Sequence, residues 1–139
     1  MSRFTTTLFL AIALAAVSVG VAFAHTSSTV HVTIRHQLHH CHAWSVDGSA
    51  YKASQTVDVA RGTTVVFTNN DMMPHTLIQL SGPKASLAHA FMNHMGATAK
   101  VVFAKAGTYS FKTKAGEDYM AGVKTIGADN VLRLTVVVK

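Results

Sequence analysis

Thr-Val-His-Val-Thr-Ile-Arg, residues 29–35, is the stretch that decides the fold. Apolar and polar side chains alternate along it, and a period of two predicts a β-strand. Working outward, alternation or β-branched runs predict further strands at residues 55–59, 63–68, 75–80, 100–104, 108–113 and 131–138. Short strands separated by turn signals are typical of an all-β sandwich. The alternation fails over residues 82–98, where we expect a loop with one short helical turn.

The first 24 residues are typical of a cleavable signal peptide. Arg3 supplies a positive start, residues 8–21 are apolar, and Ala22-Phe23-Ala24 has the small-x-small pattern of a cleavage site. We therefore expect a mature domain, residues 25–139, exported to the periplasm or the extracellular space without stable membrane insertion after cleavage. An uncleaved N-terminal anchor is the alternative, although the apolar run is short for a membrane span.

Charge and motifs narrow the function classes. Removing the leader takes one basic residue, Arg3, from the 12 basic and 6 acidic residues, which leaves a formal charge of +5. The basic residues are scattered as singles, without an arginine-rich run, so we expect no nucleic-acid binding. No Ser-His-Asp order, nucleophile elbow, paired acids or phosphate loop stands out, so we expect no enzyme activity. We expect a monomer.

His39-His40-Cys41-His42-Ala43-Trp44 is the segment that points to chemistry. Cys41 is the chain's only cysteine, so it cannot form an intramolecular disulfide. A thiolate beside neutral imidazoles suits soft or borderline metals, copper and zinc above all. The alternative is an inert thiol packed as a small hydrophobe.

Two further segments carry a family resemblance. Residues 69–75, Asn-Asn-Asp-Met-Met-Pro-His, resemble the cupredoxin segment that presents the first histidine ligand to copper. Residues 106–111, Ala-Gly-Thr-Tyr-Ser-Phe, resemble the penultimate strand of the same family. The resemblance extends over residues 29–138. It implies an eight-stranded, cupredoxin-like Greek-key β-sandwich with one copper ion at one end, and it favours copper over zinc.

The chain departs from the family where the remaining ligands are expected. Thr113 and Gly116 stand at the positions of the family's cysteine and second histidine, so the usual site cannot form there. We hypothesise that Cys41 and His42 replace them from a loop after the first strand, off the regular ladder, while His75 keeps its ordinary place. The predicted metal ligands are Cys41, His42, His75 and Met95, with Met92, Met120 and His94 as alternatives to Met95.

The resemblance and the relocated ligands predict an exported copper protein that carries out one-electron transfer, with an unknown redox or copper-delivery protein as partner. A copper chaperone or a copper-resistance protein is the alternative, and a metal-free interaction module is the second alternative. After signal cleavage, His25 could chelate copper through its amine and ring. We expect the remaining side chains not to bind the metal: His31 and His36 lie at the surface, Met72 and Met73 in the core, and Trp44 packs as a lid over the site.

Overall fold

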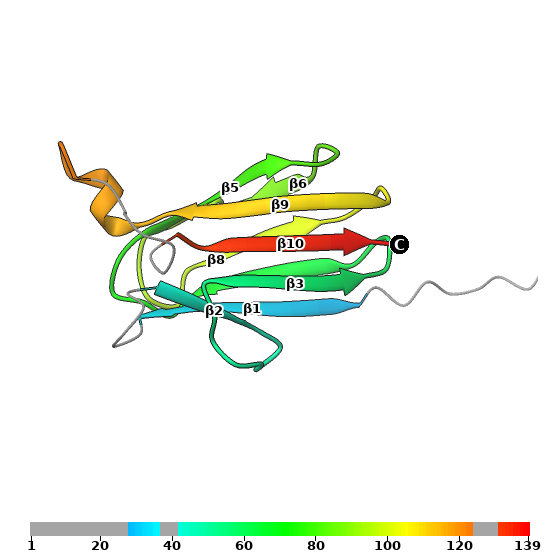
Figure 1. Ribbon diagram of the computed structural model, residues 1–139, viewed down its shortest axis with the longest axis horizontal. Coiled ribbons are helices and arrows are strands. Elements are labelled where there is room, and N and C mark those ends of the chain that lie inside the picture. The colour runs from blue at the N-terminus through cyan, green and yellow to red at the C-terminus, as the bar shows by residue number, and fades with distance from the viewer. Residues whose placement is uncertain (1–27, 37–41, 124–130) are drawn as a thin grey trace, which may run out of the picture.

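The computed structural model describes residues 28–36, 42–123 and 131–139. Nearly all of its regular structure is β (Figure 1). The strands are β1 (Thr29–His36), β2 (His42–Val46), β3 (Ser54–Val59), β4 (Thr64–Asn69), β5 (His75–Ser81), β6 (Ser86–Ala88), β7 (Phe91–Met92), β8 (Thr98–Val102), β9 (Gly107–Lys114) and β10 (Arg133–Val138). A 3-10 turn, η1 (Gly116–Tyr119), follows β9.

The strands form two five-stranded sheets. One has the order β2-β1-β4-β8-β6 and the other the order β3-β10-β9-β5-β7. Two pairs, β1 with β4 and β10 with β3, are parallel, and the other pairs are antiparallel. Between β2 and β9 the chain crosses from one sheet to the other at each successive strand. The predicted all-β sandwich with Greek-key character is therefore confirmed.

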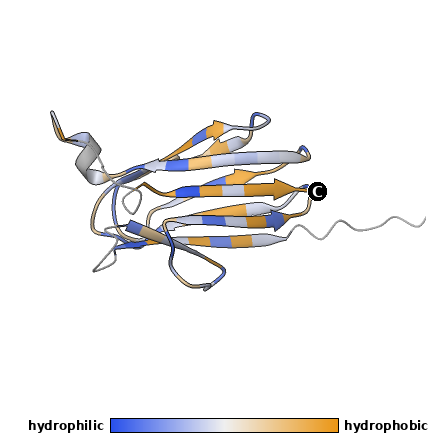
Figure 2. Cartoon of the chain, viewed as in Figure 1, coloured by the Kyte–Doolittle hydropathy of each residue, from blue (hydrophilic) through white to orange (hydrophobic). Residues whose placement is uncertain are grey.

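The core lies between the two sheets and follows from the period-two pattern of the strands. Val32 and Ile34 of β1 are fully buried, while their neighbours along the strand are exposed or half-buried. Alternation of this kind places one face of each strand inside. Figure 2 shows hydrophobic and hydrophilic residues alternating along the strands. The largest buried side chains that fill the core are Trp44, Tyr109, Phe67, Phe103 and Phe111.

The predicted strands are confirmed, with shifts of a few residues at some ends, but two segments differ from expectation. Residues 42–46, expected in a loop, form the strand β2. Its first four residues are all buried, so the segment shows no alternation by which sequence could reveal a strand. Residues 82–98 contain the short strands β6 and β7 instead of a helical turn. These additions raise the count in the described residues to ten strands, against the eight that the resemblance implies.

One end of the sandwich collects the segments of functional interest. The end of β1, the start of β2, the β4–β5 connection, the β7–β8 connection and η1 all lie there, on the left in Figure 1. None of the helical segments within the described ranges has the length and apolar character that a bilayer crossing requires. The expected leader, residues 1–24, lies outside those ranges.

Candidate metal centre

Asn69, the last residue of β4, shapes the connection that carries the site. Its side chain is fully buried, and its Nδ2 donates to Met73 O at 2.8 Å and to Met92 O at 3.1 Å. Its Oδ1 accepts a hydrogen bond from the Asp71 amide at 2.9 Å. One amide side chain thus fixes the fold of the β4–β5 connection and fastens it to β7. This arrangement turns the Asp71 side chain inward.

The Asp71 carboxylate joins two buried histidines. Its Oδ2 lies 2.9 Å from His42 Nδ1 and 3.3 Å from His75 Nε2. The two imidazole rings meet edge to face, with 4.9 Å between their centroids. Both rings have no solvent exposure, and Asp71 is also buried. The start of β2 and the start of β5 therefore converge on a single carboxylate.

Ionisation of Asp71 sets the tautomer of its partners. Burial by itself raises the pKa of Asp71, but hydrogen bonds from His42, His75 and the Met73 amide outweigh burial and hold this pKa well below its ordinary value. An ionised carboxylate only accepts hydrogen bonds, so His42 Nδ1 and His75 Nε2 must each carry a proton. A neutral His75 ring then presents Nδ1 as a lone-pair nitrogen. That atom is buried and has no hydrogen-bond partner among the described residues.

His36 adds a third imidazole at the edge of this cluster. It is the last residue of β1 and the antiparallel partner of His42, and its exposed ring lies 6.1 Å from the His42 ring, centroid to centroid. One ligand atom from each of His36, His42 and Asp71 can be chosen so that all three lie within 4.8 Å of one another. Imidazole and carboxylate donors at this spacing can hold a metal ion.

The methionines predicted as ligands occupy different surroundings. Met92 is fully buried and is the direct antiparallel partner of His75, so the two side chains lie side by side on one face of the sheet. Met95 is 55% exposed and lines a pocket at the same end of the sandwich. Met120, directly after η1, is 62% exposed. His94, also exposed, bonds through Nδ1 to Asn93 Oδ1 at 2.7 Å.

The structure also shows the surroundings of Thr113 and Gly116, the positions at which the resemblance led us to expect a cysteine and a histidine. A Cβ atom added to Gly116 would lie 2.8 Å from Met73 Cβ and 3.1 Å from its sulfur. Met73 thus packs where a side chain at position 116 would begin. Thr113 is a buried residue of β9 paired with Leu77 of β5. Both positions are filled by ordinary packing.

Several expectations about individual residues need correction. His42 lies on the β1–β2 ladder opposite His36, so the expectation that it leaves the ladder is wrong. Trp44 is a core residue whose ring packs near Phe67 and whose Nε1 donates to Arg133 O at 3.1 Å, so it is no lid. Met72 and Met73 are exposed, because the connection that carries them turns Asp71 inward and leaves them at the surface.

Of the four predicted ligands, the structure brings His42 and His75 together and places Met95 at the same end. Cys41 lies outside the described residues, directly before His42 in sequence. Sequence reasoning missed Asp71 as a site residue, and it missed the closeness of His36 to His42. The spacing of Asp71 four residues before His75 was a weak signal. Only the β1–β2 pairing reveals the role of His36.

Comparison with known proteins gives matches at the level of structure alone. No model of a known protein family matches the chain, and no curated protein matches it. A cysteine protease inhibitor from Entamoeba histolytica matches with a TM-score of 0.44 and 10% identity over 62% of this chain and 86% of that one. A purple cupredoxin from Nitrosopumilus maritimus matches with a TM-score of 0.40 and 18% identity over 76% of this chain and 97% of that one. An oxidized mutant of amicyanin matches with a TM-score of 0.40 and 19% identity over 85% and 87%. At such scores, functional conclusions rest on the site's own residues.

Proposed function

We propose that this chain is an exported copper-binding protein that holds one copper ion and transfers single electrons. The observation that carries the proposal is the meeting of His42 and His75, two fully buried imidazoles held by one carboxylate. His75 Nδ1 has no hydrogen-bond partner within the described ranges, which fits a metal ligand, because buried polar atoms without a hydrogen bond are rare unless they have another role. Cys41, adjacent to His42 in sequence, supplies the thiolate in this proposal.

The residues present fit copper in their donor types. Copper supplies a one-electron couple between its +1 and +2 states. His42 and His75 would hold the ion, and Asp71 would orient both rings through their other nitrogens, as carboxylates commonly do behind metal-bound imidazoles. A thioether completes the set: Met95 remains our predicted ligand, and the burial of Met92 beside His75 makes Met92 its strongest competitor.

The fixed positions of the two imidazoles favour electron transfer over copper handling. Both rings are buried, and Asp71 restrains both, so little rearrangement can accompany a change of charge at the site. Burial also keeps water from the imidazole nitrogens. The second candidate, a copper chaperone or copper-resistance protein, is favoured by a different observation, the exposed methionines at the same end. A metal-free interaction module is the third candidate.

Copper titration of the chain produced from its natural precursor tests the proposal. We expect one tightly bound ion, with a visible thiolate-to-copper band that disappears in Cys41→Ser. His75→Gln should lose the tight site, whereas His31→Gln, at an exposed histidine of β1, should keep it. Equal copper in His75→Gln and His31→Gln would leave only adventitious binding and favour the metal-free module. Zinc bound in preference to copper would also overturn the proposal.

Voltammetry separates the two copper functions. A reversible one-electron wave with slow release of copper to a chelator supports electron transfer. A sluggish, irreversible current with rapid release to the chelator would reject the shuttle and support copper handling.

A further inference from the structure

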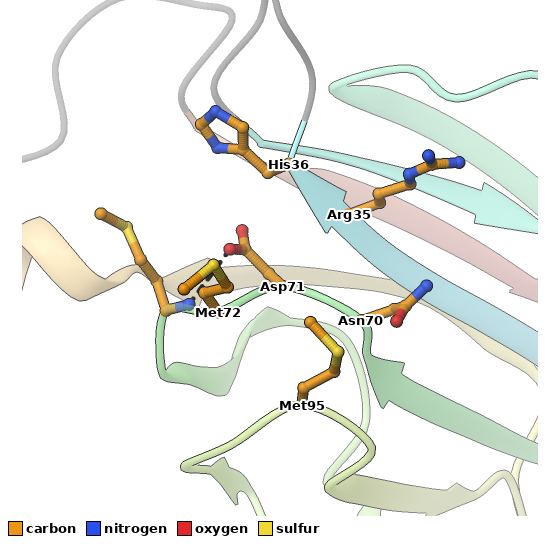
Figure 3. A pocket seen from close by; sticks show the side chains of 7 residues that line it. Arg35, His36, Asn70, Asp71, Met72 and Met95 are labelled. Atoms are coloured by element: carbon orange, nitrogen blue, oxygen red, sulfur yellow. Dashed lines mark hydrogen bonds between the residues drawn. The ribbon is translucent and has the colours of Figure 1, made fainter.

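Three methionines share one pocket at the site end of the sandwich. Met72 is 88% exposed, Met95 is 55% exposed and Met73 is 37% exposed, and all three line a pocket of about 410 Å³. Figure 3 shows Met72 and Met95 on two sides of the Asp71 carboxylate, with His36 above it. Exposed apolar side chains gathered in one concavity usually mark a binding site. We call this the methionine pocket.

The methionine pocket adjoins the buried imidazoles. Asp71 lines the pocket, and its Oδ2 contacts both His42 and His75. His36 also lines the pocket, and its ring lies 6.1 Å from the His42 ring. Asp71 and His36 therefore border both the pocket and the buried pair.

The donors of the pocket select a soft cation. Thioether sulfur is uncharged and polarizable, and it prefers Cu(I) to Zn²⁺, Mg²⁺ or other hard ions. The Asp71 carboxylate supplies negative charge at the pocket wall. Arg35 is the basic residue of the lining, and its guanidinium lies over the Tyr51 ring, 5.8 Å from the centroid. Figure 3 shows the Arg35 side chain extending away from Met72 and Met95.

We propose that the methionine pocket captures Cu(I) and is the route by which the buried centre is loaded. This inference rests on the proposed function and adds a second, outer site to it. Met72, Met73 and Met95 bind the incoming ion, which then exchanges thioether ligands for the imidazoles beyond Asp71 and His36. Copper stays in the +1 state throughout the transfer, so no oxidant or reductant takes part.

Silver binding tests the outer site without redox chemistry. Ag(I) has the charge and softness of Cu(I), and methionines labelled with ¹³C at their methyl groups report its binding one by one. In Cys41→Ser, which removes the competing thiolate, we expect the methyl signals of Met72, Met73 and Met95 to shift together. Met120, which is 62% exposed and does not line the pocket, should stay unshifted. If Cys41→Ser does not fold, the second equivalent of Ag(I) added to the native chain gives the same readout.

The rate of copper loading tests the route. Leucine matches methionine in volume and lacks sulfur, so Met72→Leu/Met73→Leu preserves the apolar lining. We expect this double variant to take up Cu(I) from a chelator complex about tenfold more slowly than the native chain, a change equivalent to roughly 1.4 kcal/mol in the barrier. Met120→Leu should load at the native rate. The final copper content of the double variant should equal that of the native chain, and so should its visible band once the bound Cu(I) has been oxidised to Cu(II) by added ferricyanide.

The two experiments distinguish the possible failures. One failure concerns the buried centre alone: Ag(I) shifts the methionine signals, but His75→Gln binds copper as the native chain does. That pair of results would support the outer site and reject the buried centre. Absent shifts, equal shifts of Met120, or an unchanged loading rate would overturn the methionine pocket as a Cu(I) site. In those cases the pocket is an apolar surface for another partner. The buried centre would then be tested separately, by the copper titration that compares His75→Gln with His31→Gln.

Discussion

Replacing Asp71 by asparagine tests the central geometry of the site. Asp71→Asn keeps the size of the side chain and leaves Oδ1 to accept from the Met73 amide, 3.1 Å away. It can replace the acceptor shared by His42 Nδ1 and His75 Nε2 with an NH₂ group, which is a donor. Each hydrogen bond to a charged group contributes about 1.5–3 kcal/mol, and one ring can change tautomer and pair again, so we expect a net loss of about 2–4 kcal/mol.

Urea unfolding of the metal-free protein, with chelator present, measures this loss. Trp44 is the only tryptophan and is fully buried, so its fluorescence reports the transition. Asp58→Asn is the matched control: Asp58 makes an exposed ion pair with Lys139 at 3.0 Å. Exposed pairs of this kind contribute about 0–1 kcal/mol. The control should therefore unfold nearly as the native chain does.

The free energy of unfolding that Asp71→Asn loses should depend on pH, and it should become smaller in acid. The folded state holds the pKa of Asp71 below its ordinary value, through the hydrogen bonds that outweigh burial. The stability that the ionised Asp71 carboxylate contributes is fully present above the carboxyl pKa of the unfolded chain, about 3.9. It is lost as pH falls below that value toward the pKa of the folded state. The difference in free energy of unfolding between the native chain and Asp71→Asn should thus be largest near neutral pH and should decrease below about pH 4. An equal gap at neutral and acidic pH, or a loss no larger than that of Asp58→Asn, would refute the reasoning.

Three further substitutions test the scaffold around the site. Asn69→Ala leaves the Asp71 amide and the Met73 and Met92 carbonyls without their side-chain partner, so thermal unfolding should show a loss of about 2–4 kcal/mol, and amide exchange should rise in the β4–β5 connection. Gly116→Ala places a Cβ 2.8 Å from Met73 Cβ and should cost about 1–3 kcal/mol in urea unfolding. Met73→Gly should recover part of that cost in the double variant, and strict additivity would contradict the contact. Trp44→Phe removes the hydrogen bond to a main-chain carbonyl and should cost about 1–3 kcal/mol in calorimetry, with the copper content unchanged.

The strands that sequence predicted well are those with one buried and one exposed face. Residues 29–35 and 108–113 alternate because their outer faces meet solvent, and both segments form strands in the structure. The strand β2 was missed because neither of its faces is open. Trp44 pairs with Lys52 through both main-chain groups, and Gln55 Nε2 donates to Trp44 O at 2.7 Å, so the chain that follows β2 covers its edge. The first four residues of β2 are buried on both faces. Burial on both sides removes the period from the sequence.

The sequence predicted the residues of the candidate site only where the residue type and its neighbours themselves indicate metal binding. His42 and His75 could be chosen from a cysteine-histidine segment and a Pro-His element. Asp71 could not, because an aspartate after two asparagines reads equally well as a turn residue exposed to solvent. Its inward orientation depends on the hydrogen bond from its own amide to Asn69 Oδ1, which sequence does not show.

The parallel pairing of β1 with β4 explains how His36 and His42 reach the end of the sandwich that holds Asp71 and His75. The register places Ile34 beside Asn69, and the Asn70 amide donates to Ile34 O at 2.8 Å, so β1 and β4 finish together. His36 at the end of β1 and His42 at the start of β2 therefore lie next to Asp71 of the β4–β5 connection, which leads into His75. This register depends on main-chain hydrogen bonds, so the side chains at Thr113 and Gly116 do not set it. The proposed centre can thus take its two imidazoles from strands of both sheets, β2 and β5, whichever residues stand at positions 113 and 116.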